Sequence, residues 1–267
     1  MECMSTTSVP VGQLLRGWRT RRRMSQLDLA LDAEISTRHL SFLETGRANP
    51  SREMILRLAE RMEIPLRERN MLLLAGGFAP VYAERPLESP ELVRARDVVQ
   101  FILDGHMPYP ALAIDRHWNL QAFNAAIGPL LVDVDPALLQ PPVNVLRVSL
   151  HPAGLAPRIE NLAEWGTHLL NQLDRQIERS ADPTLVTLRE ELRGYPLGDQ
   201  PASVQASDLI VPLVLRSAGG TLRFVSTTTV FGTPVEITLS ELAIESFFPA
   251  DVETAALLKA LPPVPVD

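Results

Sequence analysis

Residues 36–51 read STRHLSFLETGRANPS, and this stretch contains one complete short helix and the start of the next. Ser36 is a favourable N-cap, and the helix after it places its two leucines on one side. Gly46 suits the left-handed conformation that often ends a helix, and Ser51 caps a new one. The pattern therefore predicts a short helix with polar residues exposed at its N-terminal end.

Four further helices are predicted around this one. Apolar side chains recur at helical spacing after Val11, Ser25, Ser51 and Pro65. In the helix after Ser25, Asp28 completes a capping box. Residues 10–78 are thus expected to form an all-α domain of five short helices.

The helices after Ser25 and Ser36 are joined by a tight turn, which is the arrangement of a helix-turn-helix. In that motif the second helix lies in the major groove of DNA. The residues expected to face base edges are Thr37, Arg38 and Ser41, while Arg47 and Arg52 return toward phosphate. Two readings are possible for Phe42, which either contacts a thymine methyl or packs against other side chains of the domain. His39 is expected to be a surface or phosphate-side residue rather than a metal ligand.

The residues SQxxLA, at Ser25, Gln26, Leu29 and Ala30, carry a resemblance to the XRE, or lambda-repressor-type, helix-turn-helix family. This resemblance implies that Gln26 binds backbone phosphate and that Thr37 and Arg38 read bases. Glu34 is a departure, because the family usually has glycine at that point of the turn. A left-handed backbone costs a residue with a Cβ about 1 kcal/mol, so the turn is expected to be slightly strained.

Charge is unevenly distributed along the 267 residues. Residues 1–80 hold 12 Arg against 9 Asp and Glu, whereas the whole chain has a net charge of -7 and a single lysine, Lys259. A mildly basic head on an acidic body suggests that the head meets a polyanion. No stretch is apolar enough for a membrane span or a signal peptide, so a cytoplasmic protein is expected. The lone Cys3 lies in an expected disordered tail, residues 1–9, and provides no disulfide or metal motif.

A second domain is expected after a Gly- and Pro-rich linker over residues 79–90. Within residues 91–262, two short strand-like runs precede a long helical stretch, and three runs rich in Val, Ile, Thr and Phe follow it. This order predicts an α+β domain, a five-stranded antiparallel sheet with helices over one face.

The second domain resembles the PAS-like ligand-binding domain of MmyB-like transcription regulators. The resemblance rests on PYPAL at 108–112, DRHWN at 115–119, NVLR at 144–147 and HPAGL at 151–155, and the head shows the family's RHLSFLETGR segment. The resemblance implies a DNA-binding regulator with a sensor for small apolar ligands. A bound fatty acid is one ligand of this kind.

The expected ligand-binding residues combine apolar side chains with scattered polar partners. They are Asn124, Leu146, Arg147, His151, Leu162, Trp165, Leu169 and Phe247. Arg147 and His151 are the expected anchors for a carboxylate, although an ion pair with Glu160 or Glu164 would satisfy them equally. For the apolar members the alternative is ordinary core packing.

The function predicted is that of a sequence-specific transcription regulator that binds double-stranded DNA as a homodimer and responds to a small apolar ligand. The alternative is a DNA-binding interaction or antitoxin-type protein whose second domain only dimerises. An enzyme is not expected, because the sequence has no nucleophile elbow, phosphate loop or paired metal-ligand motif. Neither a required cofactor nor a metal nor a membrane partner is expected.

Overall fold

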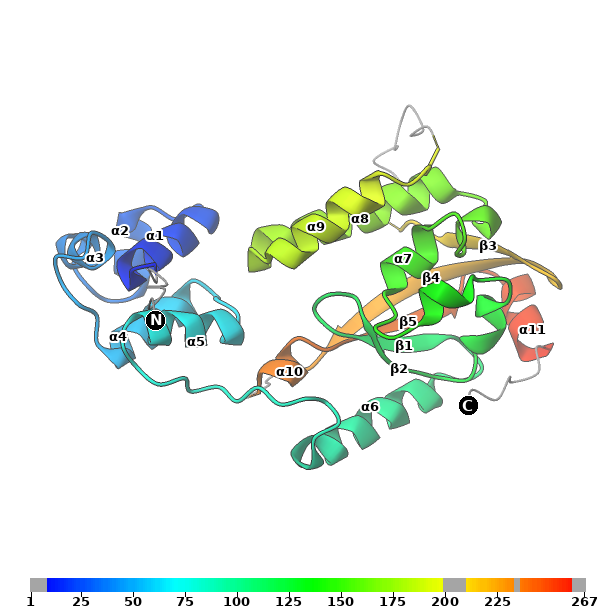
Figure 1. Ribbon diagram of the computed structural model, residues 1–267, viewed down its shortest axis with the longest axis horizontal. Helices are drawn as coiled ribbons and strands as arrows, with labels where there is room; N and C mark the ends of the chain where they lie inside the picture. Colours follow the sequence, from blue (N-terminus) through cyan, green and yellow to red (C-terminus); the bar gives the residue numbers. More distant parts are fainter. Residues whose placement is uncertain (1–8, 199–209, 233–235, 261–267) are drawn as a thin grey trace, which may run out of the picture. The chain divides into compact units, whose positions relative to one another are not determined.

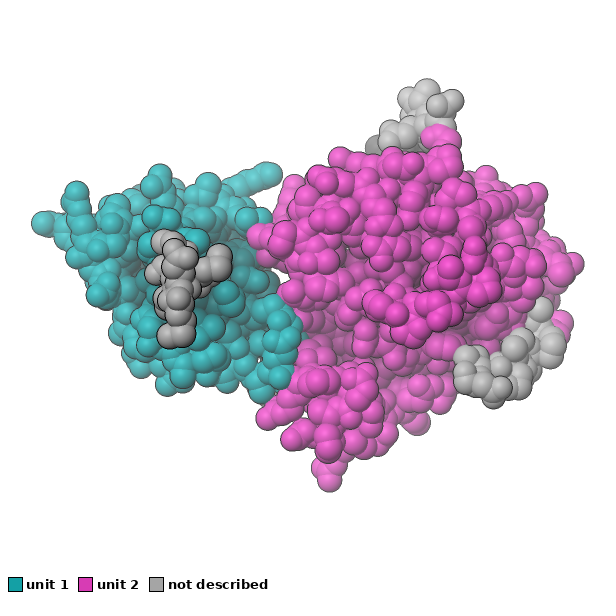
Figure 2. Space-filling model, in the orientation of Figure 1, with its two compact units in different colours: residues 1–84, 235–237 teal, residues 85–234, 238–267 magenta. Residues whose placement is uncertain are grey.

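The computed structural model describes residues 9–198, 210–232 and 236–260. These residues form two compact units, which Figure 2 shows in different colours. Unit 1 contains the described residues up to Glu84, together with Glu236 and Ile237, and unit 2 contains the remainder. The expected tail, residues 1–9, lies outside the described residues except for Val9.

Five helices build unit 1, and they begin where the capping residues predict (Figure 1). They are α1 (Val11–Arg21), α2 (Gln26–Asp32), α3 (Thr37–Glu44), α4 (Arg52–Arg61) and α5 (Leu66–Ala75). The hydroxyls of Ser25, Ser36 and Ser51 each accept a hydrogen bond from a backbone N–H in the first turn. At α2 the Asp28 carboxylate accepts in return from the backbone N–H of Ser25, at 2.9 Å, which completes the capping box. The predicted five-helix head is confirmed.

The turn between α2 and α3 contains Glu34 with φ +57°, the left-handed conformation expected at this position. Gly46, after α3, also has a positive φ, of +72°. A Cβ is tolerated at Glu34 at some cost in strain, while glycine adopts this conformation freely. Glu34 thus lies in the turn before α3, and Gly46 lies in the turn between α3 and α4.

The first part of the expected linker is bound to unit 1. The Asn70 side chain of α5 accepts hydrogen bonds from the backbone N–H groups of Val81 and Tyr82, at 2.9 and 3.1 Å. Its amide donates in turn to the Tyr82 carbonyl, at 2.7 Å. In unit 2, Leu87 is buried in the apolar cluster beneath the sheet. Both ends of the Pro-rich segment are therefore anchored within their own units.

Unit 2 is built on a five-stranded antiparallel sheet, as predicted (Figure 1). The strands are β1 (Ala111–Ile114), β2 (Leu120–Phe123), β3 (Leu213–Ser217), β4 (Gly220–Val230) and β5 (Ala243–Pro249). Their order in the sheet is β2-β1-β5-β4-β3, so the last strand in sequence occupies the centre. The five strands form two hairpins, β1–β2 and β3–β4, that are joined through β5.

The helices of unit 2 come mainly from the segment between the two hairpins. The α-helices are α6 (Val93–Gly105), α7 (Val145–Leu150), α8 (Leu162–Ser180), α9 (Pro183–Arg193), α10 (Ile237–Ser240), whose first residue belongs to unit 1, and α11 (Val252–Ala260). Short 3-10 turns are η1 (Pro90–Leu92), η2 (Gly128–Leu131), η3 (Pro136–Leu139) and η4 (Ala156–Arg158). Residues 237–240 lie within the last of the three runs rich in Val, Ile, Thr and Phe that predict strands, but they are helical.

Helices cover both faces of the sheet, so the expectation of one covered face is wrong. Alternate residues of β1 point to opposite sides: Ala111 and Ala113 join a cluster with α6, while Leu112 and Ile114 join the core under α7, α8 and α9. The small alanines permit α6 to pack closely against the strand. Residues 91–105 thus supply a covering layer for the sheet.

Gly12 in α1 is a close-contact position in the head. A methyl group there would lie 2.2 Å from the Leu43 carbonyl oxygen, whereas at Gly17 in the same helix it would meet nothing within 4 Å. We expect Gly12→Ala to lower the free energy of unfolding by about 1–3 kcal/mol through overpacking. Gly17→Ala is the control, and it should raise stability by up to about 1 kcal/mol through helix propensity. Thermal or urea unfolding compares the two, and equal effects would contradict the close contact.

Candidate DNA-binding surface and ligand cavity

The N-terminal half of α3 presents the residues predicted to read DNA. Arg38 and His39 are exposed, and Thr37 and Ser41 are partly exposed. Leu40 and Leu43, on the opposite side of the helix, are buried in the head's core. The helix therefore separates an anchoring face from a free polar face, as a recognition helix requires.

Phe42 lies under the guanidinium groups of two arginines on this surface. The Arg38 and Arg47 guanidinium carbons lie 5.3 and 5.9 Å from the centre of its ring. Such cation–π contacts restrict the arginine side chains without neutralising their charge. Phe42 thus positions the two cations that the sequence assigns to base and phosphate.

A buried carboxylate fixes the recognition helix to the helices before it. Glu44, at the end of α3, is 4 % exposed. It accepts hydrogen bonds from Nε and Nη2 of Arg19, at 2.6 and 2.9 Å. Its Oε2 also accepts from the Gln26 amide, at 2.8 Å. Burial by itself raises the pKa of Glu44, but the hydrogen bonds and charge of Arg19, with the bond from Gln26, hold that pKa below its ordinary value.

The remaining predicted DNA residues lie at the edges of α3. Gln26 is partly exposed at the start of α2, where its amide is held by Glu44. Arg47 and Arg52 are exposed on either side of the turn that leads into α4. The structure therefore gathers the expected residues around the α2–α3 motif, and Gln26 has an additional structural partner.

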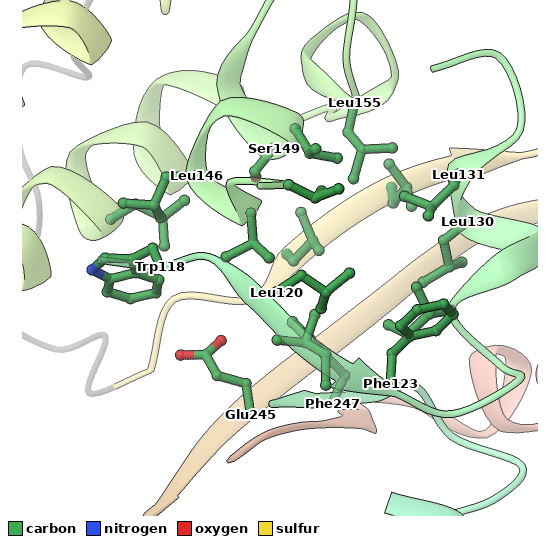
Figure 3. Close-up of a pocket in the computed structure, with 18 of the residues that line it drawn as sticks. Trp118, Leu120, Phe123, Leu130, Leu131, Leu146, Ser149, Leu155, Glu245 and Phe247 are labelled. Atoms are coloured by element: carbon green, nitrogen blue, oxygen red, sulfur yellow. The ribbon is translucent and has the colours of Figure 1, made fainter. Parts of the chain in front are cut away.

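Unit 2 contains a cavity of about 310 Å³ between the sheet and the helices above it (Figure 3). This volume lies within the range of about 300–1,000 Å³ that is usual for small-molecule sites. Apart from Ser149 and Glu245, the lining side chains are apolar: Leu112, Trp118, Leu120, Phe123, Ile127, Leu130, Leu131, Leu139, Val143, Val145, Leu146, Val148, Leu155, Trp165, Leu169, Leu213, Leu215, Phe224 and Phe247. They come from the sheet, from α7 and α8, and from the segment that follows β2.

The turn between β1 and β2 directs a tryptophan into this cavity. Asp115 accepts hydrogen bonds from the backbone N–H groups of His117 and Asn119, at 2.8 and 2.9 Å. Trp118 then adopts φ +66°. Its indole N–H donates to the Gln176 side chain of α8, at 2.7 Å, so the ring is fixed against the cavity wall.

Two matches to family models cover most of the chain. Residues 15–69 match the helix-turn-helix family, and residues 95–261 match the MmyB-like transcription regulator ligand binding domain. The chain belongs to the MmyB-like transcription regulator family. No curated protein matches it significantly.

This regulator is therefore a DNA-binding protein with a ligand-sensing domain, and both of its units have the predicted fold class. Both families are of the transcription regulator type, which fits a protein that is not an enzyme. Among the described residues, no helix combines the length and the apolar character needed to cross a membrane.

Four of the eight residues expected to bind ligand line the cavity of the regulator. They are Leu146, Trp165, Leu169 and Phe247. Leu162 packs against the surrounding core without lining the cavity. Asn124 is buried elsewhere, where its side chain accepts from the Ala111 N–H and donates to the carbonyls of Leu103 and Tyr109. It thus joins α6 and the segment before β1 to the start of that strand.

The two expected carboxylate anchors lie outside the cavity lining. Arg147 forms a two-point ion pair with Glu191 of α9, with N–O distances of 2.8 and 2.7 Å, and not with Glu160 or Glu164. The ring of His151 accepts a hydrogen bond from the Ala153 N–H through Nδ1, at 3.0 Å, and forms a T-shaped contact with the Tyr195 ring. Both side chains interact with other residues of the protein. No cationic side chain is found among the described residues that line the cavity.

Sequence reasoning missed the acidic residue of the cavity, Glu245. It is 9 % exposed on β5, and burial raises its pKa to about 7. The signal that could have identified it is strand alternation, because Glu245 lies two residues before Phe247 and so shares its face. Trp118 was also missed, although it lies within the quoted DRHWN segment.

Arg38→Ala should lower affinity for the preferred operator by about 1–3 kcal/mol and relax base preference, because an arginine on this face is suited to guanine. Arg52→Ala, the control, should weaken specific and scrambled duplexes alike. Both are measured by fluorescence anisotropy at one stated salt concentration. Equal losses on both duplexes for Arg38→Ala would show that it contacts only phosphate.

Glu245→Gln should stabilise the protein at pH 8 and leave its stability nearly unchanged at pH 4. The folded-state pKa of this carboxyl is raised, so folding binds protons between the unfolded pKa and about 7, and stability falls as pH rises through that window. The neutral amide avoids the cost of a buried charge, which is on the order of 3 kcal/mol. Thermal unfolding at several pH values provides the measurement. The same stabilisation at pH 4 and pH 8 would contradict a titrating carboxyl.

Proposed function

We propose that the regulator senses a small apolar molecule with a fatty-acid-like chain, which binds in the cavity of unit 2 and changes affinity for operator DNA. The observation that carries this proposal is the apolar lining, in which Ser149 and Glu245 are the only polar side chains among the described residues. A cavity of about 310 Å³ with few polar groups suits an effector recognised mainly by burial.

A fatty acid itself fits this cavity through its chain more readily than through its carboxylate. Neither Arg147 nor His151 lines the cavity, and no arginine, lysine or histidine is among the described residues that do. A carboxylate buried without a cation is costly. We therefore expect the ligand to share the apolar hydrocarbon chain of a fatty acid, and its carboxylate is not part of the proposal.

Ligand binding acts on DNA affinity only if the ligand distinguishes two states of the protein. A tenfold change in operator binding requires about 1.4 kcal/mol of coupling between the two sites. We propose that this coupling operates in a cytoplasmic homodimer, because one head reads only a half-site. Sedimentation of the full-length chain at micromolar concentration tests the dimer, and a monomer with and without operator would refute it.

Leu131→Trp should abolish the response of operator binding to ligand, because Leu131 lines the cavity and a larger side chain would occupy it. Val132→Trp is the matched control. Val132 is the next residue along the chain, and its side chain is 55 % exposed and does not line the cavity. Native mass spectrometry of gently extracted protein should show a bound small molecule in the wild type and in Val132→Trp, and none in Leu131→Trp. Fluorescence anisotropy with an operator selected from random duplexes should show that ligand changes DNA affinity in the wild type and in Val132→Trp, but not in Leu131→Trp.

The alternative is a DNA-binding interaction or antitoxin-type protein whose second domain only dimerises. It predicts no copurifying small molecule and identical operator binding by both tryptophan variants. That result would remove the sensor proposal and leave the DNA-binding function intact.

A further inference from the structure

Glu245 is an acidic side chain placed in a cavity that is otherwise almost wholly apolar. It lies on the central strand β5, between Leu112 of β1 and Thr228 of β4 in the sheet register. In Figure 3 its carboxyl lies on the Trp118 side of the cavity, and Leu130 and Leu131 lie on the other side. With 9 % of its surface exposed, it is the acidic member of the described lining.

The described groups that act on the Glu245 carboxyl are uncharged. The Thr228 hydroxyl of β4 donates to Oε1 at 3.4 Å, and the Gln172 side chain of α8 is a second hydrogen-bond partner. From β1 the facing residue is Leu112, which is apolar. Among the described residues, no cation is a partner of this carboxyl. Ser149, the other polar lining residue, already accepts from the Trp165 indole at 3.1 Å.

Glu44 shows what a structural buried carboxylate looks like in the same chain. It has a two-point arginine partner and an amide donor, and its pKa is lowered despite burial. Glu245 has no cation partner among the described residues, its hydrogen bond from Thr228 is long at 3.4 Å, and burial raises its pKa to about 7. Near neutral pH the fold therefore leaves Glu245 with unused hydrogen-bonding capacity beside the cavity.

We propose that Glu245 recognises the head group of the effector, and that this head group donates hydrogen bonds, most strongly as a protonated amine, and is not a carboxylate. This assignment rests on the proposed ligand-sensing function of the cavity. An ammonium group would supply the cation that the carboxylate lacks, with three N–H donors. A ligand carboxylate would instead meet a like charge whenever Glu245 is ionised.

The test uses three probes with the same ten-carbon chain: decylamine, 1-decanol and sodium decanoate. Each is titrated into the full-length protein by calorimetry, below the concentration at which it aggregates. At pH 8 decylamine should bind at least about tenfold more tightly than decanoate, with decanol between them. Decanoate should bind more tightly at pH 6 than at pH 8, because Glu245 is then mostly protonated, while decanol should change little.

Glu245→Gln is the informative variant, because it retains the shape of the side chain and removes its charge. It should reduce the difference between decylamine and decanoate to about twofold or less and remove the pH dependence of decanoate binding. Glu253→Gln, on the exposed face of α11, makes the same charge change at the surface. It should leave the wild-type order intact, which separates cavity binding from attraction of the amine to an acidic surface.

Equal affinity of the wild type for amine and decanoate at pH 8 would overturn the head-group assignment, whether or not the variant folds. The same conclusion follows if Glu245→Gln leaves the preference unchanged. In both cases the cavity still binds chain-like molecules, so the proposed function stands. If none of the three probes binds the wild type, the head-group assignment fails together with the chain-like ligand class.

Discussion

The central strand β5 is the constraint on which unit 2 depends. It pairs with β1 on one side and β4 on the other, so its alternating side chains enter both layers of the domain. Ile244 is buried in the cluster with α6, and Glu245 and Phe247 line the cavity. A slip of one residue in this register would exchange the two faces and remove both the packing and the site.

Local signals were sufficient to predict unit 1. Serine caps, a capping box and apolar stripes at helical spacing all concern residues within a few positions of one another, and each is found in the structure. The left-handed Glu34 was expected from the resemblance to a family that usually has glycine at that point of the turn. Most of the strands were also predictable, because short apolar runs, several of them enriched in Val, Ile, Thr and Phe, are separated by turns.

Long-range pairing limited the prediction of the cavity. Leu146, Trp165, Leu169 and Phe247 could be proposed from apolar character. The partner of Arg147 could not, because Glu191 lies 44 positions away and is brought near only by the packing of α7 and α9. The same applies to α6, whose position beneath the sheet follows from the alanines of β1 and not from its own periodicity.

The contacts around α3 also affect how much side-chain conformational entropy is lost when the head binds DNA. Glu44 holds the helix to Arg19 and Gln26, and Phe42 restrains Arg38 and Arg47. Ordering a mobile side chain on binding costs about 0.5–1.5 kcal/mol. Because part of that ordering exists in the free head, association requires less of it, and a rigid reading surface distinguishes sequences by fit instead of adapting to each one.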